Sequence, residues 1–169
     1  MKAVRLRPTN LGEIDHIMSW VNDPEVVANI ANIRGSISRA DELKWLKQAL
    51  ANSNMRLYSI YEYKQYVGQA ALPQIYWPGR NARFSLIIKR AFQGRGLGYQ
   101  AAALLFDIAF KNLKLHKLWC LALESNPKTV YLYREKLGMK EEGRLIDDYY
   151  INGRYHNMLR FYITEQMWA

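Results

Sequence analysis

The stretch Gln93-Gly94-Arg95-Gly96-Leu97-Gly98 decides the fold of this chain. It follows an alternating apolar run at residues 82–89 that is typical of a strand, and it precedes an apolar run at residues 98–112 with helical spacing. Three glycines in five residues let the backbone turn sharply. The N–H groups freed by that turn add to the positive end of the following helix. The stretch therefore predicts an anion-binding loop, with a plain glycine-rich turn as the alternative.

Two common phosphate-binding motifs do not fit this loop. A dinucleotide-binding βαβ unit needs an acidic residue about 20 residues further on, which the chain lacks. A Walker loop needs Gly-Lys followed by Ser or Thr, which is also missing. The loop must therefore belong to another architecture.

The segments around the loop predict a mixed arrangement of strands and helices. The expected strands are residues 2–7, 55–63, 66–77, 82–89, 117–123, 139–150 and 154–164, and the expected helices are 11–21, a short one from 24, 38–50, 98–112 and 126–137. Thr9 is expected to cap the first helix and Gly138 to end the last one. Asn152-Gly153 predicts a hairpin between the last two strands. We expect an α/β (α+β) fold in a single domain over residues 1–169.

Composition excludes several classes of protein. Half of the 169 residues are apolar and 23% are charged, which is typical of a folded chain with a substantial core. The chain has neither an apolar run long enough to span a membrane nor an apolar N-terminal stretch, so we expect a soluble, cytoplasmic protein without a membrane partner. Cys120 is the one cysteine, and the three histidines are scattered, so no metal site is expected.

The positive charge is concentrated around the glycine loop. Residues 80–117 contain eight basic residues and one acidic residue, and so carry +7 of the net charge of +9. Such a block can be a solvated surface, a nucleic-acid footprint or a site for a phosphorylated ligand. No common nucleic-acid-binding motif accompanies the block, so we do not expect a nucleic-acid partner.

Several spaced motifs resemble one enzyme superfamily. Gln93-x-x-Gly96-x-Gly98 after a strand resembles the pyrophosphate-binding signature of the GNAT superfamily of N-acetyltransferases, and residues 126–143 resemble the second half of the same pattern. Residues 6–8, 20–24 and 149–155 narrow the resemblance to the branch of ribosomal-protein N-terminal acetyltransferases and spermidine or diamine N-acetyltransferases. The resemblance implies a central mixed, mostly antiparallel sheet of about seven strands with flanking helices, splayed between the fourth and fifth strands.

The resemblance also implies a co-substrate and roles for particular residues. Acetyl-CoA would donate its acetyl group directly to a primary amine. The implied cofactor contacts are Leu86, Ile87, Ile88 and Asn126 for the pantetheine, Gln93, Gly94, Arg95, Gly96, Leu97, Gly98 and Tyr99 for the pyrophosphate, and Tyr133 at the thiol. Tyr133 is the implied general acid, because a phenol can protonate the departing CoA thiolate but is a poor base at neutral pH. Tyr131 is the alternative acid, with Tyr133 then only packing.

Two positions depart from the family pattern. The interval from Tyr133 to Gly138 is one residue longer than usual. Arg83 stands where spermidine enzymes of this branch carry a glutamate that is thought to help deprotonate the amine, and an arginine cannot serve as a base. Ser85, Glu124 or water are the remaining candidates for that role.

The amine acceptor stays open between a polyamine, an amino sugar and a protein N-terminal amine. Arg83 and Ser85 are the candidate acceptor-binding residues, and the acidic pairs at residues 141–142 and 147–148 are candidates to receive a cationic amine. Residues 1–60 hold eight basic and six acidic side chains, a balance that leans slightly against a polyamine. A CoA-binding regulatory protein without catalysis is the alternative function, followed by a basic nucleic-acid-binding module, and a homo-oligomer is open.

Overall fold

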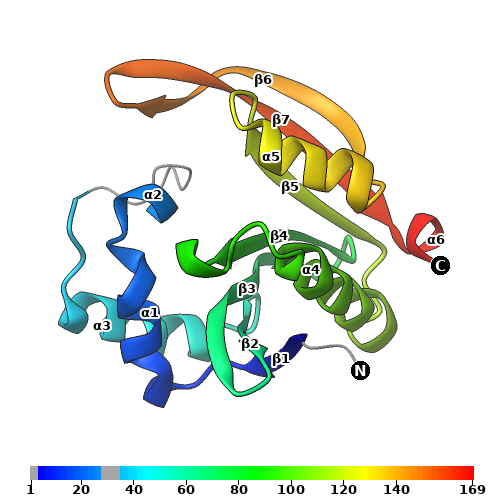
Figure 1. Ribbon diagram of the computed structural model, residues 1–169. Helices are drawn as coiled ribbons and strands as arrows, with labels where there is room; N and C mark the ends of the chain where they lie inside the picture. The colour runs from blue at the N-terminus through cyan, green and yellow to red at the C-terminus, as the bar shows by residue number, and fades with distance from the viewer. Residues whose placement is uncertain (1–3, 28–34) are drawn as a thin grey trace.

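All strands of the described chain join one mixed sheet (Figure 1). The computed structural model describes residues 4–27 and 35–169, so residues 2 and 3 of the first expected strand lie outside it. The strands are β1 (Val4–Pro8), β2 (Arg56–Glu62), β3 (Gln65–Tyr76), β4 (Asn81–Ile88), β5 (Lys117–Leu123), β6 (Lys140–Ile151) and β7 (Arg154–Thr164). Their order across the sheet is β1-β2-β3-β4-β5-β7-β6, and β4 with β5 is the parallel pair. The expected fold class is confirmed.

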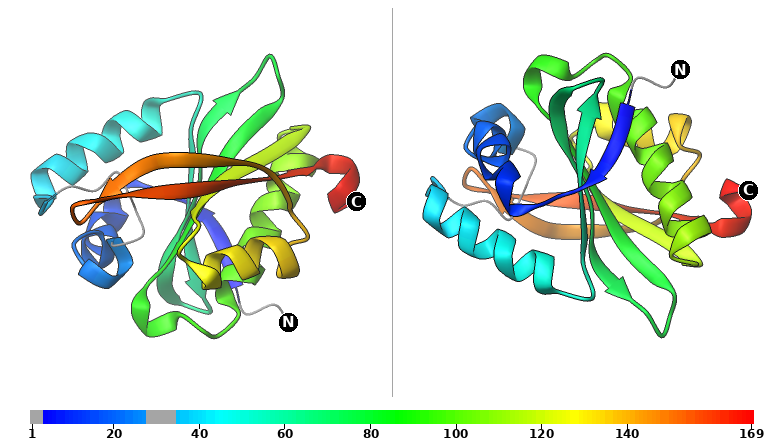
Figure 2. Two further views of the ribbon diagram at one scale, coloured as in Figure 1. Left: turned by 90° about the horizontal axis from the view of Figure 1, so that it is seen from above. Right: turned by 90° about the horizontal axis from the view of Figure 1, so that it is seen from below.

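Helices cover both faces of this sheet (Figure 2). They are α1 (Ile14–Val21), α2 (Pro24–Val27), α3 (Arg39–Ala51), α4 (Leu97–Asp107), α5 (Pro127–Tyr131) and α6 (Glu165–Trp168). Buried side chains of α1 and α3 form one apolar cluster with β2 and β3, whereas α4 packs into a second and larger cluster with β3, β4, β5 and β7. None of these described helices is both long and apolar enough to cross a membrane.

The start of the first helix differs from the prediction. Thr9 is not its cap, because the Thr9 hydroxyl hydrogen-bonds Ser59 at 3.0 Å. Asn10 caps a 3₁₀ turn at Leu11–Glu13 instead, since its side chain accepts from the Gly12 N–H at 2.9 Å while the Glu13 carboxylate accepts from the Asn10 N–H at 3.0 Å. This reciprocal capping box satisfies more of the free N–H groups at the helix start than Thr9 alone could.

The fourth and fifth strands separate soon after they meet. They pair only at Asn81 with Lys117, Ala82 with Leu118 and Arg83 with Trp119. Beyond Arg83, β4 stays with β3 while β5 stays with β7, and the two halves of the sheet diverge (Figure 1). The predicted splay is confirmed, and it leaves residues 84–88 of β4 without a strand on one side.

The extra residue after Tyr133 is taken up by a wider turn of helix. The expected helix over 126–137 is α5 followed by a π-helical segment at Leu132–Lys136, where the Leu137 N–H donates to the Leu132 carbonyl at 2.9 Å. A π-turn holds one residue more than an α-turn, and such single turns occur frequently at functional sites. The insertion therefore leaves Gly138 at the helix end in the left-handed conformation, with φ of 65°.

Candidate active site

The glycine loop presents an open row of backbone donors. Gly94 and Gly96 both have φ of 75°, and a Cβ on either would meet nothing within 4 Å. Within the described part of the chain, no acceptor lies in hydrogen-bonding range of the N–H groups from Gly94 to Tyr99. These N–H groups lie at and just before the start of α4, where the helix dipole is positive. The arrangement fits an anion such as a pyrophosphate.

Gln93 attaches this loop to the end of β4. Its amide Nε2 donates to the carbonyl oxygen of Ile88 at 2.9 Å. Gly98 lies at the other end of the loop, where a Cβ would be 3.5 Å from Leu86 Cδ2 and 3.8 Å from Leu132 Cδ2. The loop is therefore held against β4 and the segment after α5.

The outer edge of β4 turns backbone groups toward the gap, and of these the Ile88 carbonyl already accepts from Gln93. The Lys89 N–H donates to the Val67 carbonyl on β3 at 2.8 Å. Because neighbouring residues of a strand point their backbone groups to opposite sides, Ile87 faces β3 while Leu86 and Ile88 face the gap. Of the three β4 residues implied for the pantetheine, Leu86 and Ile88 thus have backbone groups directed toward the gap. Ile87 does not, and its side chain packs on the α1–α3 cluster.

Two arginines near the loop have carboxylate partners. Arg95 pairs with Glu62 on β2 at 2.9 Å, and Arg90 pairs with Glu25 on α2 at 2.8 Å. Both pairs are largely exposed on the arginine side, so they add little to stability. Because these side chains are engaged, the backbone N–H groups remain as the main anion donors of the loop.

Tyr133 lies buried where the sheet opens. Its ring packs edge-on against Phe84 of β4 at 5.4 Å and against Phe161 of β7 at 5.9 Å between centroids. Burial and the neighbouring Cys120 thiol raise the pKa of Tyr133 well above its ordinary value, and the positive charge of Arg83 opposes them. The phenol therefore keeps its proton at neutral pH, as a general acid requires. Tyr131, the alternative, is 53% exposed.

Asn126 caps α5 beside the gap. Its Oδ1 accepts from the Thr129 N–H at 3.2 Å, which satisfies one of the free donors at the helix start. The capping bond uses the oxygen only, so the amide NH₂ remains able to donate to a ligand.

Arg83 occupies the last paired position before the gap. Its guanidinium lies 6.0 Å from the centre of the Trp119 ring, and its Nε is buried without a hydrogen-bond partner in the described chain. Ser85 is half-buried two residues further along β4, on the same face. The two candidate acceptor residues are thus neighbours at the apex of the gap.

The acidic side chains considered for the amine are mostly engaged. Glu124 accepts from Arg144 at 2.7 and 2.8 Å, and Arg144 lowers the pKa of Glu124. Glu141 pairs with Arg134 at 2.6 Å, and Glu142 pairs with both Lys117 and Arg160. Glu124 is therefore a poor base, and Glu141 and Glu142 are not free to receive a cationic amine, contrary to the sequence-based expectation.

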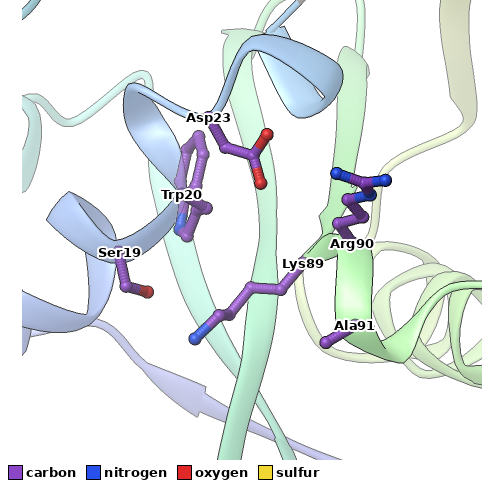
Figure 3. A pocket seen from close by; sticks show the side chains of 6 residues that line it. All are labelled: Ser19, Trp20, Asp23, Lys89, Arg90 and Ala91. Atoms are coloured by element: carbon purple, nitrogen blue, oxygen red, sulfur yellow. The ribbon is translucent and has the colours of Figure 1, made fainter.

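A shallow depression that the sequence did not indicate lies between α1 and the segment after β4 (Figure 3). It encloses about 410 Å³ and is lined by Ser19, Trp20, Asp23, Lys89, Arg90 and Ala91. The Lys89 side chain extends across it toward Ser19 and Trp20. Its lining comes from segments about 70 residues apart and carries both signs of charge, so no local motif marks it. Residues 4–27 and 35–169 contain no cluster of three potential metal ligands.

The family model of the acetyltransferase (GNAT) domain matches residues 3–140. The chain belongs to this family. It is similar to the spermidine N(1)-acetyltransferase of Vibrio cholerae, with 35% identity over 127 residues, which are 74% of this chain and 73% of that protein. The crystal structure of spermidine N-acetyltransferase from Vibrio cholerae in complex with CoA and spermine covers 99% of both chains, with a TM-score of 0.93 and 27% identity. A dodecameric structure of that enzyme has a TM-score of 0.87 and 26% identity, covering all of this chain and 98% of its own.

As a GNAT acetyltransferase, the chain is an N-acetyltransferase that uses acetyl-CoA. Its own residues fit this co-substrate. The loop N–H groups from Gly94 to Tyr99 are without acceptors in the described chain, and Leu86 and Ile88 turn backbone groups into the gap. The loop N–H groups could therefore donate to the phosphates of acetyl-CoA, and the backbone groups of β4 could hydrogen-bond the amides of its pantetheine.

Proposed function

We propose that this GNAT acetyltransferase acetylates a primary amine of a polyamine such as spermidine, with the reaction centred in the gap between β4 and β5. The observation that carries the proposal is the separation of these strands after Arg83 and Trp119, directly beside the glycine loop and Tyr133. The polyamine is supported by the relatives, which match nearly the whole length of the chain. This similarity is stronger evidence than the charge balance of residues 1–60, which slightly favoured an acceptor other than a polyamine.

The proposed binding roles follow from the geometry. The loop N–H groups from Gly94 to Tyr99 would hold the pyrophosphate, with Gln93 acting as the anchor of the loop. The gap-facing groups of Leu86 and Ile88 would bind the pantetheine, together with the free amide of Asn126. Donors fixed in a low-dielectric gap stabilise developing negative charge on a thioester oxygen more strongly than water does.

Tyr133 is the proposed general acid. Its phenol is neutral, buried and placed at the gap, so it can give its proton to the departing sulfur. The amine must be neutral before it attacks. Arg83 cannot remove its proton and Glu124 is held by Arg144, so we assign this proton to solvent.

A panel of acceptors tests the proposed function. The purified protein would be incubated with acetyl-CoA and, separately, spermidine, an amino-sugar nucleotide and a peptide with a free N-terminus, and release of the CoA thiol would be followed. Spermidine should give a kcat/KM at least about tenfold above the other two. Preference for the peptide or the sugar would contradict the proposal that the acceptor is a polyamine. Binding of acetyl-CoA without turnover of any amine would indicate a CoA-binding regulatory protein without catalysis.

We also propose that the chain assembles into a homo-oligomer. The dodecameric structure of the Vibrio cholerae relative supports this, since the two folds agree over nearly their whole length. Light scattering after size-exclusion chromatography should give a mass several times 19.8 kDa. A mass of one chain at micromolar concentration would contradict the proposal.

A further inference from the structure

One side of β5 and β7 has no helix packed on it in the described chain. Leu118 of β5 and Phe161 of β7 point to the side of α4 and α5, where they join the larger apolar cluster. Because side chains alternate along a strand, Trp119 and Leu121 of β5 and Tyr162 of β7 point to the opposite side. They belong to neither apolar cluster of the described residues, since α1 and α3 lie beside the other half of the sheet (Figure 1). Three large apolar side chains are thus left without a layer of helix over them.

Charged side chains hold the rings on this side of the sheet in place. The Arg160 guanidinium carbon lies 4.0 Å from the centre of the Trp119 ring, and the Lys117 Nζ lies 4.9 Å from the centre of the Tyr162 ring. Glu142 of β6 pairs with both cations, with Arg160 at 3.0 Å. We call this surface the β5–β7 face, and it consists of Lys117, Trp119, Leu121, Glu142, Arg160 and Tyr162.

The chemistry of the β5–β7 face is typical of a protein interface. Aromatic residues and arginine are enriched where proteins contact one another. Burial raises the pKa of Glu142, but the hydrogen bonds from Lys117 and Arg160 outweigh it and hold the pKa below its ordinary value. The face therefore carries both signs of charge beside apolar rings. A nucleic acid fits it less well, because the Glu142 carboxylate lies between the two cations and repels phosphates.

We propose that a second copy of this chain docks on the β5–β7 face. The inference rests on the proposed homo-oligomer and assigns one of its interfaces. Two copies related by a twofold axis present the same surface to each other, so this surface must complement itself. The β5–β7 face does so, because Glu142 of one copy can meet Lys117 or Arg160 of the other. A carboxylate has acceptor positions beyond the two that Glu142 uses within its own chain.

A charge placed on the β5–β7 face tests the interface. Leu121 lies opposite Arg160 in the pairing of β5 with β7, so the carboxylate of Leu121→Glu has an ion-pair partner within its own chain and the fold can tolerate it. A docked second copy would have to bury that additional charge. The concentration at which the assembly half-dissociates, measured by analytical ultracentrifugation, should rise at least about tenfold. Leu50→Glu is the matched control, because Leu50 is a 40% exposed residue of α3, and it should behave as the wild type.

Thiol labelling measures the same contact without placing a charge in it. Lys140 is exposed and lies directly opposite Tyr162, at the rim of the β5–β7 face. Lys140→Cys would be treated with a bulky maleimide, against a low background because Cys120 is buried and burial raises the pKa of its thiol. Labelling should be lost in the native assembly and regained in urea. Lys47→Cys, at an exposed position of α3, is the control and should label in the native protein.

Three results would overturn the inference. They are an unchanged assembly of folded Leu121→Glu, an equal loss of assembly in Leu50→Glu, or native labelling of Lys140→Cys at the rate of Lys47→Cys. If Leu121→Glu does not fold, the labelling decides. A single-chain mass for the wild type would overturn the homo-oligomer itself and the interface with it. Preference for another amine would contradict the proposed acceptor alone, so these failures are distinguishable.

Discussion

At the scale of single residues, the proposed chemistry depends on a buried phenol. Tyr133 is only 7% exposed, and it lies in the π-helical segment Leu132–Lys136. Burial raises the pKa of its phenol, so the phenol is protonated at neutral pH. Its neighbour Tyr131, two residues earlier, is exposed to solvent and has no such environment.

Replacing Tyr133 by Phe should therefore remove the proton and little else. We expect kcat to fall by roughly 10²-fold, with little change in the dissociation constant of acetyl-CoA, because the ring contacts with Phe84 and Phe161 remain. Steady-state kinetics and calorimetry measure the two quantities. Tyr131→Phe is the control, and a larger loss of kcat in that variant would transfer the role to Tyr131.

At the scale of elements, the glycine loop and β4 form the proposed binding edge for acetyl-CoA. Gly96 combines a φ of 75° with open space where a Cβ would lie. Gly96→Val should weaken acetyl-CoA binding at least about tenfold, because its side chain strains the turn and occupies the approach to the N–H groups. Gly153→Val is matched to it, with φ of 79° and equally open space at the β6–β7 turn. Equal acetyl-CoA affinity of the two folded variants would refute the loop as the phosphate site.

The pairing of β3 with β4 gives a second prediction about elements. A Cβ on Gly68 would lie 2.0 Å from the Ile87 carbonyl oxygen, so an alanine there must displace the backbone of β4. Gly68→Ala should reduce the free energy of unfolding by about 1–3 kcal/mol and also weaken acetyl-CoA binding. Gly98→Ala, whose Cβ would meet side chains at 3.5 Å or more, should not reduce the free energy of unfolding to a comparable degree. Urea unfolding checks both, and an undisturbed Gly68→Ala protein would contradict the tight β3–β4 contact.

The strand, the loop and the helix start of this proposed edge could be predicted from the sequence because their determinants are local. The loop motif, the alternating run of β4 and the capping Asn126 all lie within short segments. The extra residue after Tyr133 was visible in the sequence, but the π-turn that accommodates it was not predicted. The partners of Arg95 and Glu142 were not predictable, since Glu62 is 33 residues from Arg95 and Lys117 is 25 from Glu142. The same holds for the missing partner of Arg83, because only the folded sheet shows which carboxylates reach which cations.

At the scale of the whole molecule, a buried polar network ties the N-terminal helices to the sheet. The Glu13 carboxylate accepts from Ser59 at 2.8 Å and from the Tyr61 hydroxyl at 2.6 Å, both on β2. Burial, followed by the hydrogen bond and charge of Glu13, raises the pKa of Tyr61 to about 12. Since the folded pKa lies above the unfolded value near 10, the stability contributed by the neutral phenol is present below pH 10 and is lost as the pH rises through about 12.

Tyr61→Phe should consequently flatten the alkaline part of the stability profile. Between pH 10 and 12, the wild type should lose about 1.4 kcal/mol per pH unit more than the variant, although the variant starts lower because Glu13 loses a donor. The measurement is the free energy of unfolding in urea at several pH values. Parallel curves for the two proteins would contradict the assigned role of Tyr61.

The central claim is that acetyl-CoA occupies the gap where β4 leaves β5, with its phosphates on the glycine loop. A titration of ¹⁵N-labelled protein with CoA tests it most directly, because each backbone N–H reports on its own surroundings. The amide resonances of Gly94 to Tyr99, Leu86 and Ile88 should shift most, and those of β1 should stay in place. Largest shifts at Ser19, Trp20 and Lys89 around the depression beside α1, with the loop amides unmoved, would contradict the account.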